Sequence, residues 1–310
     1  MEPAWLVPGK NYCHPDWGLI SKVFDSDQTD DALQEFYTHV CRLWMNCLLE
    51  EFGPGYQLVE SANFILVSRA SNNVVCEALQ FLERCYYRIR RGMPFLPDKL
   101  GYGKWPVLCL DDDAFYRYLS DYIEDEEGSF ASVGGVFLSR GYGHFALPSE
   151  DLHLYSQVLA HELSHALLTT LELPAWLDEA ITMGVEERLA SGNAYVLDRE
   201  MIRRHQKYWT EEAIQAFWAG TSFWFPDEGQ ELSYHLSRFL FRALYQGGSV
   251  DPAAVGEFIK NAKREDAGYL AAKDVLDIDL AEVLSHLIGE GDWRPNRETI
   301  QRLRTETGDS

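Results

Sequence analysis

The chain has 310 residues, of which 46% are hydrophobic and 25% are charged, which is typical of a globular protein with a sizeable core and excludes a disordered or fibrous chain. Its 27 Lys and Arg residues stand against 49 Asp and Glu residues, and the formal net charge of −22 repels phosphate backbones and anionic membrane surfaces. We therefore expect neither a nucleic-acid partner nor a membrane partner.

The first residues, MEPAWLVPGKNY, are interrupted by prolines where a signal peptide would carry a basic segment and then a continuous apolar one. No later stretch approaches the roughly 20 apolar residues of a membrane span. The six cysteines have no close paired spacing and several fall within apolar patterns, so we expect reduced thiols in the core. These features predict a cytoplasmic location, although export without a signal sequence would leave no mark in the chain.

Helices and strands alternate in the first half of the chain. Apolar residues recur at helical spacing over 30–52, with acids in the first turn and Gly53 after the end, which predicts an N-terminal amphipathic helix. The following patterns predict a strand at 63–67, a helix at 74–90, a strand at 105–110 and a helix at 114–123. Two strand–helix units in succession favour a small mixed sheet covered by helices.

The pattern changes at residue 133. Residues 133–147 alternate glycines with β-forming residues, which predicts strands joined by a glycine-rich turn, or a flexible rim beside a cleft. The predicted fold is α+β, with a small mixed sheet and then a mostly helical C-terminal region. We divide it into an N-terminal helical extension (1–55), an α/β core (56–195) and a helical C-terminal part (196–310). The helical patterns lie near 150–171, 175–191, 198–219, 230–246, 252–262 and 279–288.

The residues that carry chemistry gather in one predicted helix. Ser149 is a suitable N-cap for this helix, and Glu150 and Asp151 place acids in its first turn. The motif His161-Glu162-Leu163-Ser164-His165 lies further along the same helix. Residues four apart on a helix lie about 40° apart around the axis and about 6 Å apart along it, so both imidazoles can bind one ion.

A catalytic zinc ion takes three protein ligands and keeps a fourth position for water. The third ligand is expected from the next helix, because Pro174 suits a helix start and places Glu179 one turn inside it. Glu162, beside the first histidine, is expected to take the proton of the water and to return it to the leaving group. The sequence thus predicts a Zn²⁺ site formed by His161, His165 and Glu179, with Glu162 as the general base.

These two motifs resemble those of the gluzincin metallopeptidases, in which HExxH is followed by a tryptophan-leucine-x-glutamate-glycine segment that donates the third ligand. Here the second segment is Pro174-Ala-Trp-Leu-Asp-Glu179, and a weaker likeness covers residues 58–245. The resemblance implies a zinc peptidase with a peptide or protein substrate. Ala180 departs from the usual glycine, and Met183 occupies the place of an acid that orients a zinc-binding histidine. That hydrogen bond has two alternative sources, Asp178 and Glu186.

Gluzincins also use a tyrosine or histidine from a later helix to stabilise the oxyanion that forms when water attacks a carbonyl. By this resemblance, Tyr234 in the segment 231–240 is the first candidate and His235 is the second. The alternative for Tyr234 is a place in the core, because an aromatic residue beside an apolar helical stripe is often buried there.

Other candidates have weaker signals. His144 and His153 precede the motif helix and are typical of caps or surface positions. The aromatic residues within 217–225 are expected mainly to pack, with the lining of a substrate pocket as the alternative. A glycine group lacks phosphate-loop spacing, and the resemblance implies instead an edge strand that pairs with extended peptide backbone. These glycines are Gly134, Gly135, Gly141 and Gly143.

The complete ligand set together with Glu162 favours a zinc peptidase over three alternatives. The first alternative is a zinc-bearing binding or structural module with this fold, which four protein ligands around the metal would favour. The second is a zinc hydrolase of non-peptide amides or esters, because the site chemistry does not fix the acyl group. The third is a surface helix on which two histidines meet by chance.

Overall fold

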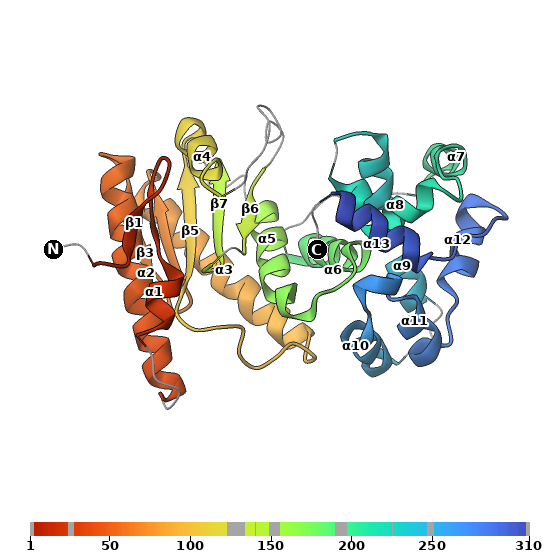
Figure 1. The fold of residues 1–310 in the computed structure, drawn as a ribbon, viewed down its shortest axis with the longest axis horizontal. Coiled ribbons are helices and arrows are strands. Elements are labelled where there is room, and N and C mark those ends of the chain that lie inside the picture. Colours follow the sequence, from red (N-terminus) through yellow and green to blue (C-terminus); the bar gives the residue numbers. More distant parts are fainter. Residues whose placement is uncertain are drawn as a thin grey trace. The chain divides into compact units, whose positions relative to one another are not determined.

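The computed structural model describes residues 3–23, 28–122, 134–139, 141–148, 156–189, 197–224, 226–246 and 251–307. The chain divides into two compact units, Met1–Arg90 with Asp98–Ala166, and Arg91–Pro97 with Leu167–Ser310. The fold is α+β, as predicted, with strands in the first unit and a largely helical C-terminal region (Figure 1). The division into an N-terminal extension (1–55), an α/β core (56–195) and a helical C-terminal part (196–310) stays a prediction. The predicted N-cap Ser149, its neighbours Glu150 and Asp151, and His153 lie outside the described residues.

The first unit contains a five-stranded sheet with the order β3-β4-β5-β7-β6. The three inner strands run parallel to one another, and each outer strand is antiparallel to its neighbour. The inner strands are almost wholly buried, as expected for parallel strands in a covered sheet. The strands are β3 (Gln57–Glu60), β4 (Phe64–Ser68), β5 (Trp105–Leu110), β6 (Val136–Leu138) and β7 (His144–Pro148).

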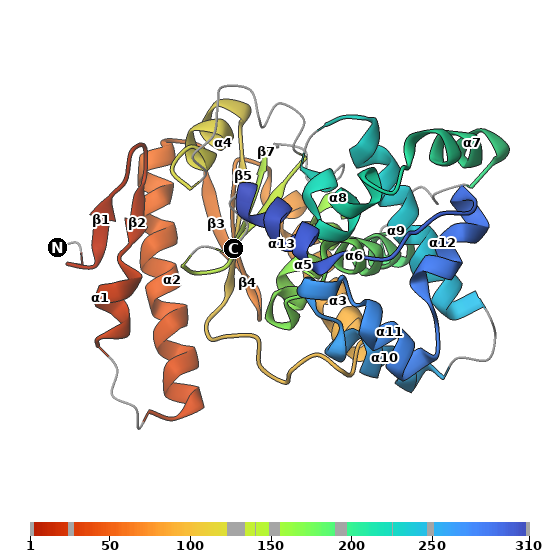
Figure 2. The same cartoon turned by 45° about the vertical axis from the view of Figure 1, so that its right-hand side comes forward.

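The helices of the first unit that start at Asp30 and Asp112 begin at side-chain caps. Thr29 accepts a hydrogen bond from the N–H of Ala32, and Asp111 accepts one from the N–H of Ala114, so both helices start with a satisfied donor. A separate two-stranded hairpin, β1 and β2, lies beside the long helix α2 (Figure 2). These elements are β1 (Leu6–Pro8), β2 (Cys13–Pro15), α1 (Trp17–Ser21), α2 (Asp30–Phe52), α3 (Asn72–Gly92), α4 (Asp112–Leu119) and α5 (Ser156–Leu168).

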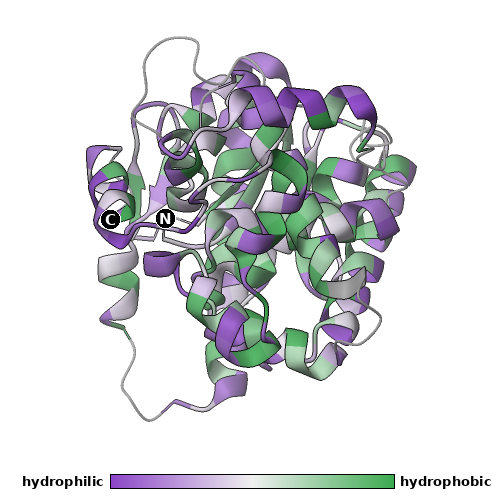
Figure 3. Ribbon diagram, turned by 90° about the vertical axis from the view of Figure 1, so that its right-hand side faces the viewer, coloured by the Kyte–Doolittle hydropathy of each residue, from purple (hydrophilic) through white to green (hydrophobic). Residues whose placement is uncertain are grey.

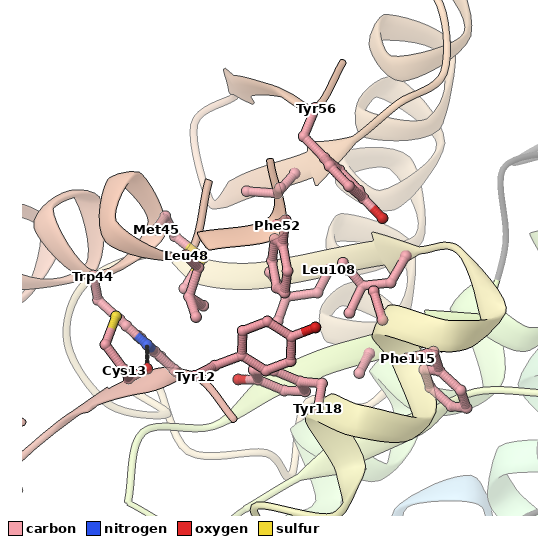
Figure 4. Packing of buried hydrophobic residues seen from close by; sticks show 14 of the residues in the cluster. Tyr12, Cys13, Trp44, Met45, Leu48, Phe52, Tyr56, Leu108, Phe115 and Tyr118 are labelled. Atoms are coloured by element: carbon pink, nitrogen blue, oxygen red, sulfur yellow. Dashed lines mark hydrogen bonds between the residues drawn. The ribbon is translucent and has the colours of Figure 1, made fainter. Parts of the chain in front are cut away.

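Aromatic rings fill the core of the first unit (Figure 4). The ring of Tyr12, which comes from the N-terminal hairpin, packs against Phe52 at a centroid distance of 4.9 Å and against Tyr118 at 6.0 Å. The indole N–H of Trp44 donates to the carbonyl of Cys13 at 3.2 Å. Fully burying one large apolar side chain contributes roughly 1.5–3 kcal/mol. This core therefore holds the hairpin against α2 and α4.

One cysteine pair contradicts the prediction of reduced thiols. Cys13 on β2 and Cys47 on α2 form a disulfide with a sequence separation of 34. A spacing of this kind gives no local signal, and only the packing of the hairpin on α2 brings the two residues together. Burial raises the pKa of the Cys85 thiol to about 11, which keeps it protonated and unreactive. The other cysteines with free thiols are Cys41, Cys76 and Cys109.

The second unit is helical over its described residues. Helices α6 and α9 pack together, and the buried Arg238 of α9 forms an ion pair with Glu187 of α6. Hydrophobic residues along the helices alternate with hydrophilic ones, as Figure 3 shows. The helices are α6 (Ala175–Leu189), α7 (Arg199–Tyr208), α8 (Ala213–Ala219), α9 (Glu228–Gln246), α10 (Pro252–Asn261), α11 (Tyr269–Leu276), α12 (Leu280–Ile288) and α13 (Arg297–Glu306).

The predicted helix at 198–219 is two helices, α7 and α8. The chain breaks at Trp209, which has an extended backbone with ψ of 125°, and the hydroxyl of Thr210 then accepts from the N–H of Ala213 to start α8. Strands β1 to β3 and helices α1, α11 and α13 are absent from the sequence prediction. Among the described helices, none has both the length and the apolar character needed to cross a bilayer.

Candidate metal centre

Helix α5 brings the two histidines of the motif together. The Nε2 atoms of His161 and His165 lie 3.1 Å apart, and the two ring planes are inclined by 75°. Both residues are half-buried, whereas Leu159, Leu163 and Leu167 on the same helix are fully buried. The helix is therefore held by its apolar face, and its two imidazoles converge as the i, i+4 spacing predicts.

A short turn leads from α5 to α6. The 3₁₀ turn Thr169–Leu171 is followed by Glu172, which has left-handed backbone angles of φ 48° and ψ 44°. The carbonyl of Pro174 accepts from the N–H groups of the first turn of α6. The buried indole of Trp176 donates to the carbonyl of Ala267 at 2.9 Å, which fixes the start of α6 within the second unit. Glu179 lies one turn further along this anchored helix.

Glu179 completes a group of three metal-ligating side chains. One ligand atom from each of His161, His165 and Glu179 lies within 4.8 Å of the other two. A tetrahedral zinc ion with Zn–N distances of about 2.0–2.1 Å would hold two nitrogens about 3.3–3.4 Å apart, which is close to the spacing of the two Nε2 atoms. Two imidazoles and a carboxylate are also a ligand set found at catalytic zinc sites. The donors therefore fit zinc in both type and spacing, although this geometry is not specific for that metal.

Glu162 is held by the outer strand of the sheet. Its Oε2 atom accepts a hydrogen bond from the main-chain N–H of Phe137 on β6 at 2.8 Å. Both residues are half-buried. This contact with β6 limits the directions in which the carboxylate can point.

The sequence offers Asp178 and Glu186 as alternative sources of a hydrogen bond to a histidine of the motif, in place of Met183. Met183 is buried in α6, and Oδ1 of Asp178 accepts from the hydroxyl of Thr182 at 3.4 Å. The hydrogen bond from Asp178 or Glu186 to a zinc-binding histidine stays a prediction. The ion pair between Arg238 and Glu187 joins α6 to the helix that carries Tyr234.

Tyr234 and His235, the predicted oxyanion stabilisers, lie on α9 and are half-buried. The ring of Tyr234 packs edge-on against Phe223 at a centroid distance of 5.3 Å, which fits the alternative of a packing role. Burial lowers the pKa of His235, whose ring lies 6.3 Å from that of His205. The catalytic role of either residue stays a prediction.

His144 is a buried core residue, which corrects the expectation of a cap or surface position. Its Nδ1 lies 2.7 Å from the carbonyl of Tyr142, and its Nε2 lies 2.8 Å from the hydroxyl of Tyr118. Because a carbonyl can only accept, Nδ1 carries the proton. Burial lowers the pKa of His144 to about 4, so the ring stays neutral at pH 7.

Sequence reasoning missed a second group of donor atoms. Cys13, Cys47 and Glu51 each bring one potential ligand atom within 4.8 Å of the other two. The two sulfur atoms are joined in the disulfide, and Oε2 of Glu51 accepts from the N–H of Cys13 at 2.8 Å. The structure therefore shows this group in its oxidised form.

In comparisons with known proteins, the chain matches no family model and no curated protein sequence.

Proposed function

We propose that the protein is a zinc-dependent hydrolase of the gluzincin type and that its substrates are peptides or proteins. The observation that carries the proposal is the convergence of His161, His165 and Glu179, together with the carboxylate residue Glu162 next to His161 in the chain. Purely structural zinc sites fill all four positions with protein ligands, whereas three ligands and an adjacent base are the arrangement of a catalytic site.

The proposed chemistry assigns separate tasks to these residues. A bound zinc ion would supply a water molecule that loses its proton near neutral pH. Glu162 takes that proton and later delivers it to the leaving amine, which is general acid–base catalysis by one carboxylate. His161, His165 and Glu179 would hold the ion, and Tyr234, with His235 as the alternative, would donate a hydrogen bond to the oxyanion.

A peptide substrate is favoured by the position of β6. This strand is one of the two outer strands of its sheet, the kind of strand to which an extended peptide can be added. The hydrogen bond from Phe137 to Glu162 attaches this strand to the proposed base. An amide bond in a peptide laid along β6 would therefore lie beside the residues of the proposed reaction.

The test combines metal analysis with a cleavage screen. We expect about one zinc per chain in the purified protein, and we expect cleavage within a peptide library that stops with a chelator and returns when zinc is added back. A parallel screen of simple esters and non-peptide amides separates the alternative hydrolase. Bound zinc without turnover in either screen would favour a binding module, and a protein that does not bind zinc would contradict the whole proposal.

A cytoplasmic location is a separate proposal, and the cysteines bear on it in opposite directions. Four free thiols are typical of a reducing compartment, whereas the Cys13–Cys47 disulfide is typical of an oxidising one. Thiol counting on protein denatured directly from its native source decides between them. We expect six reactive thiols if the protein functions in the cytoplasm, and four would place it elsewhere.

A further inference from the structure

Strand β6 contacts Glu162 through a main-chain group. The N–H of Phe137 donates to Oε2 of Glu162 at 2.8 Å. We propose that this N–H is a positioning group for the reaction, which fixes one carboxylate oxygen on β6 and leaves the other for proton transfer. The inference rests on the proposed function, because only a catalytic Glu162 needs a defined orientation.

The register of β6 explains why this N–H points away from the sheet. Phe137 pairs with Phe145 of β7. In an antiparallel pair, the main-chain groups of successive residues face the neighbouring strand and the outer edge in turn. Because the N–H of Phe137 binds Glu162, we infer that the main-chain groups of Phe137 face outward and that those of Val136 and Leu138 face β7.

A glycine sets how closely β6 approaches α5. A Cβ atom added to Gly135 would lie 2.5 Å from Cγ1 of Val158 and 3.4 Å from the side chain of Leu147. Val158 lies on α5, one turn before Glu162. A side chain at residue 135 would therefore press the strand away from the helix, and the absence of one lets the N–H of Phe137 reach the carboxylate.

The contact is strong enough to hold the base. A hydrogen bond to an ionised carboxylate is roughly twice as strong as one between neutral groups. Orientation matters because a displacement of about 1 Å at a reacting group can slow a reaction by about 100-fold. A donor on a strand that is paired with β7 is also better fixed than a donor on a flexible side chain.

The contact itself can be tested without a substrate. Amide hydrogen exchange at Phe137 is measured by NMR in the parent protein and in Glu162→Ala, with Val136 and Leu138 as internal controls. We expect exchange at Phe137 to be at least about tenfold faster in the variant, because its acceptor is gone, and the two ladder amides to be unchanged. Equal exchange at Phe137 in both proteins would overturn the inference. This result does not depend on hydrolysis, so it is separate from a failure of the proposed function.

The role of the N–H is tested by comparing Phe137→Pro with Phe137→Ala. Both variants lack the aromatic ring of Phe137, and only the proline variant also lacks the main-chain N–H. In the parent protein this N–H faces outward and is not part of the ladder to β7, so its loss leaves the sheet paired. We expect kcat of the proline variant to be about 10- to 100-fold below that of the alanine variant, with KM and zinc content unchanged. The same kcat in both variants would overturn the positioning role.

A second pair of variants serves if the proline variant does not fold. Gly135→Ala should lower kcat because the added methyl group meets Val158, and Val158→Ala should restore kcat in the double variant because it removes the obstructing methyl groups. The reference is Val158→Ala alone. A full-activity Gly135→Ala protein, or a loss that Val158→Ala does not relieve, would count against the inference.

Discussion

Two groups of side chains that could hold a metal ion form in this protein by different routes. His161, His165 and Glu179 come from consecutive helices, whereas Cys13, Cys47 and Glu51 bring a hairpin together with α2. In both groups the ligand atoms lie within 4.8 Å of one another. The first group follows from the spacing of residues along the chain, and the second depends on the aromatic core that packs the hairpin. Two groups with a similar donor geometry can therefore differ in whether the sequence predicts them.

The largest expected effect concerns Glu162, which follows His161 in the chain and is the proposed base beside the first group. Glu162→Gln should reduce turnover by roughly 100- to 10,000-fold, because the amide cannot take a proton. Zinc content should stay at the parent level, since the three ligands are intact. The exposed Glu172 supplies the matched control, and Glu172→Gln should keep parental turnover. Undiminished cleavage by Glu162→Gln would show that Glu162 is not the general base. The first group would then lack the feature that separates it from the second group.

The next effect concerns the third ligand. Glu179→Gln should weaken zinc binding by more than about 100-fold, because loss of a group that merely supports a ligand already costs 10- to 100-fold. Competition with a chromophoric chelator measures the affinity, and circular dichroism checks that α6 is retained. Parental affinity would mean that Glu179 lies near the histidines without binding the ion.

The disulfide of the second group should act on stability alone. Replacing Cys13 and Cys47 together by serine should lower the free energy of unfolding by about 3–4 kcal/mol, the value expected for opening a loop of this length. Urea denaturation measures the loss, and Cys76→Ser serves as the control because that thiol is free. Binding of a second zinc ion by the reduced parent, but not by the double variant, would show that both groups bind metal. The second group would then not act on stability alone.

Histidines outside both groups should give the protein a pH-dependent stability. Burial is the main cause that lowers the pKa of His144 and of His205 to about 4, whereas an unfolded histidine titrates near 6.5. Between these values the unfolded chain binds more protons, so stability is fully present above pH 6.5 and is lost as the pH falls toward 4.

Each of these two histidines should lower the free energy of unfolding by on the order of 3 kcal/mol as the pH falls toward 4. Urea denaturation at pH 7.5 and pH 4.5 should show it, and His144→Gln should reduce the difference between the two pH values. An unchanged difference in that variant would mean that His144 is not a source of the acid sensitivity.

Local patterns account for what the sequence could predict. Helix α2 spans Asp30–Phe52, the range indicated by its period, its first-turn acids and the following glycine. The pairing of His161 with His165 follows from helix geometry alone, and the approach of Glu179 follows from a short turn after the motif helix. Each of these features depends on residues close together in the chain.

Features that depend on distant residues were not predictable. The packing of Tyr12 on Phe52 and Tyr118 fixes the hairpin, and the disulfide depends on that packing. His144 is buried because β7 is an inner strand, which its neighbours in sequence do not reveal. The bond from Phe137 to Glu162 needs both the register of β6 and the place of α5, and neither can be inferred from one element alone.

The main-chain origin of the donor on β6 has a consequence for natural variation. Any residue except proline supplies the same N–H at position 137, so drift of the side chain there would leave the contact in place. Residue 135 is under the opposite constraint, because its neighbours leave no space for a side chain. In homologous proteins we therefore expect an invariant glycine beside a freely varying residue, a pattern in which the variable position is the one that acts on the base.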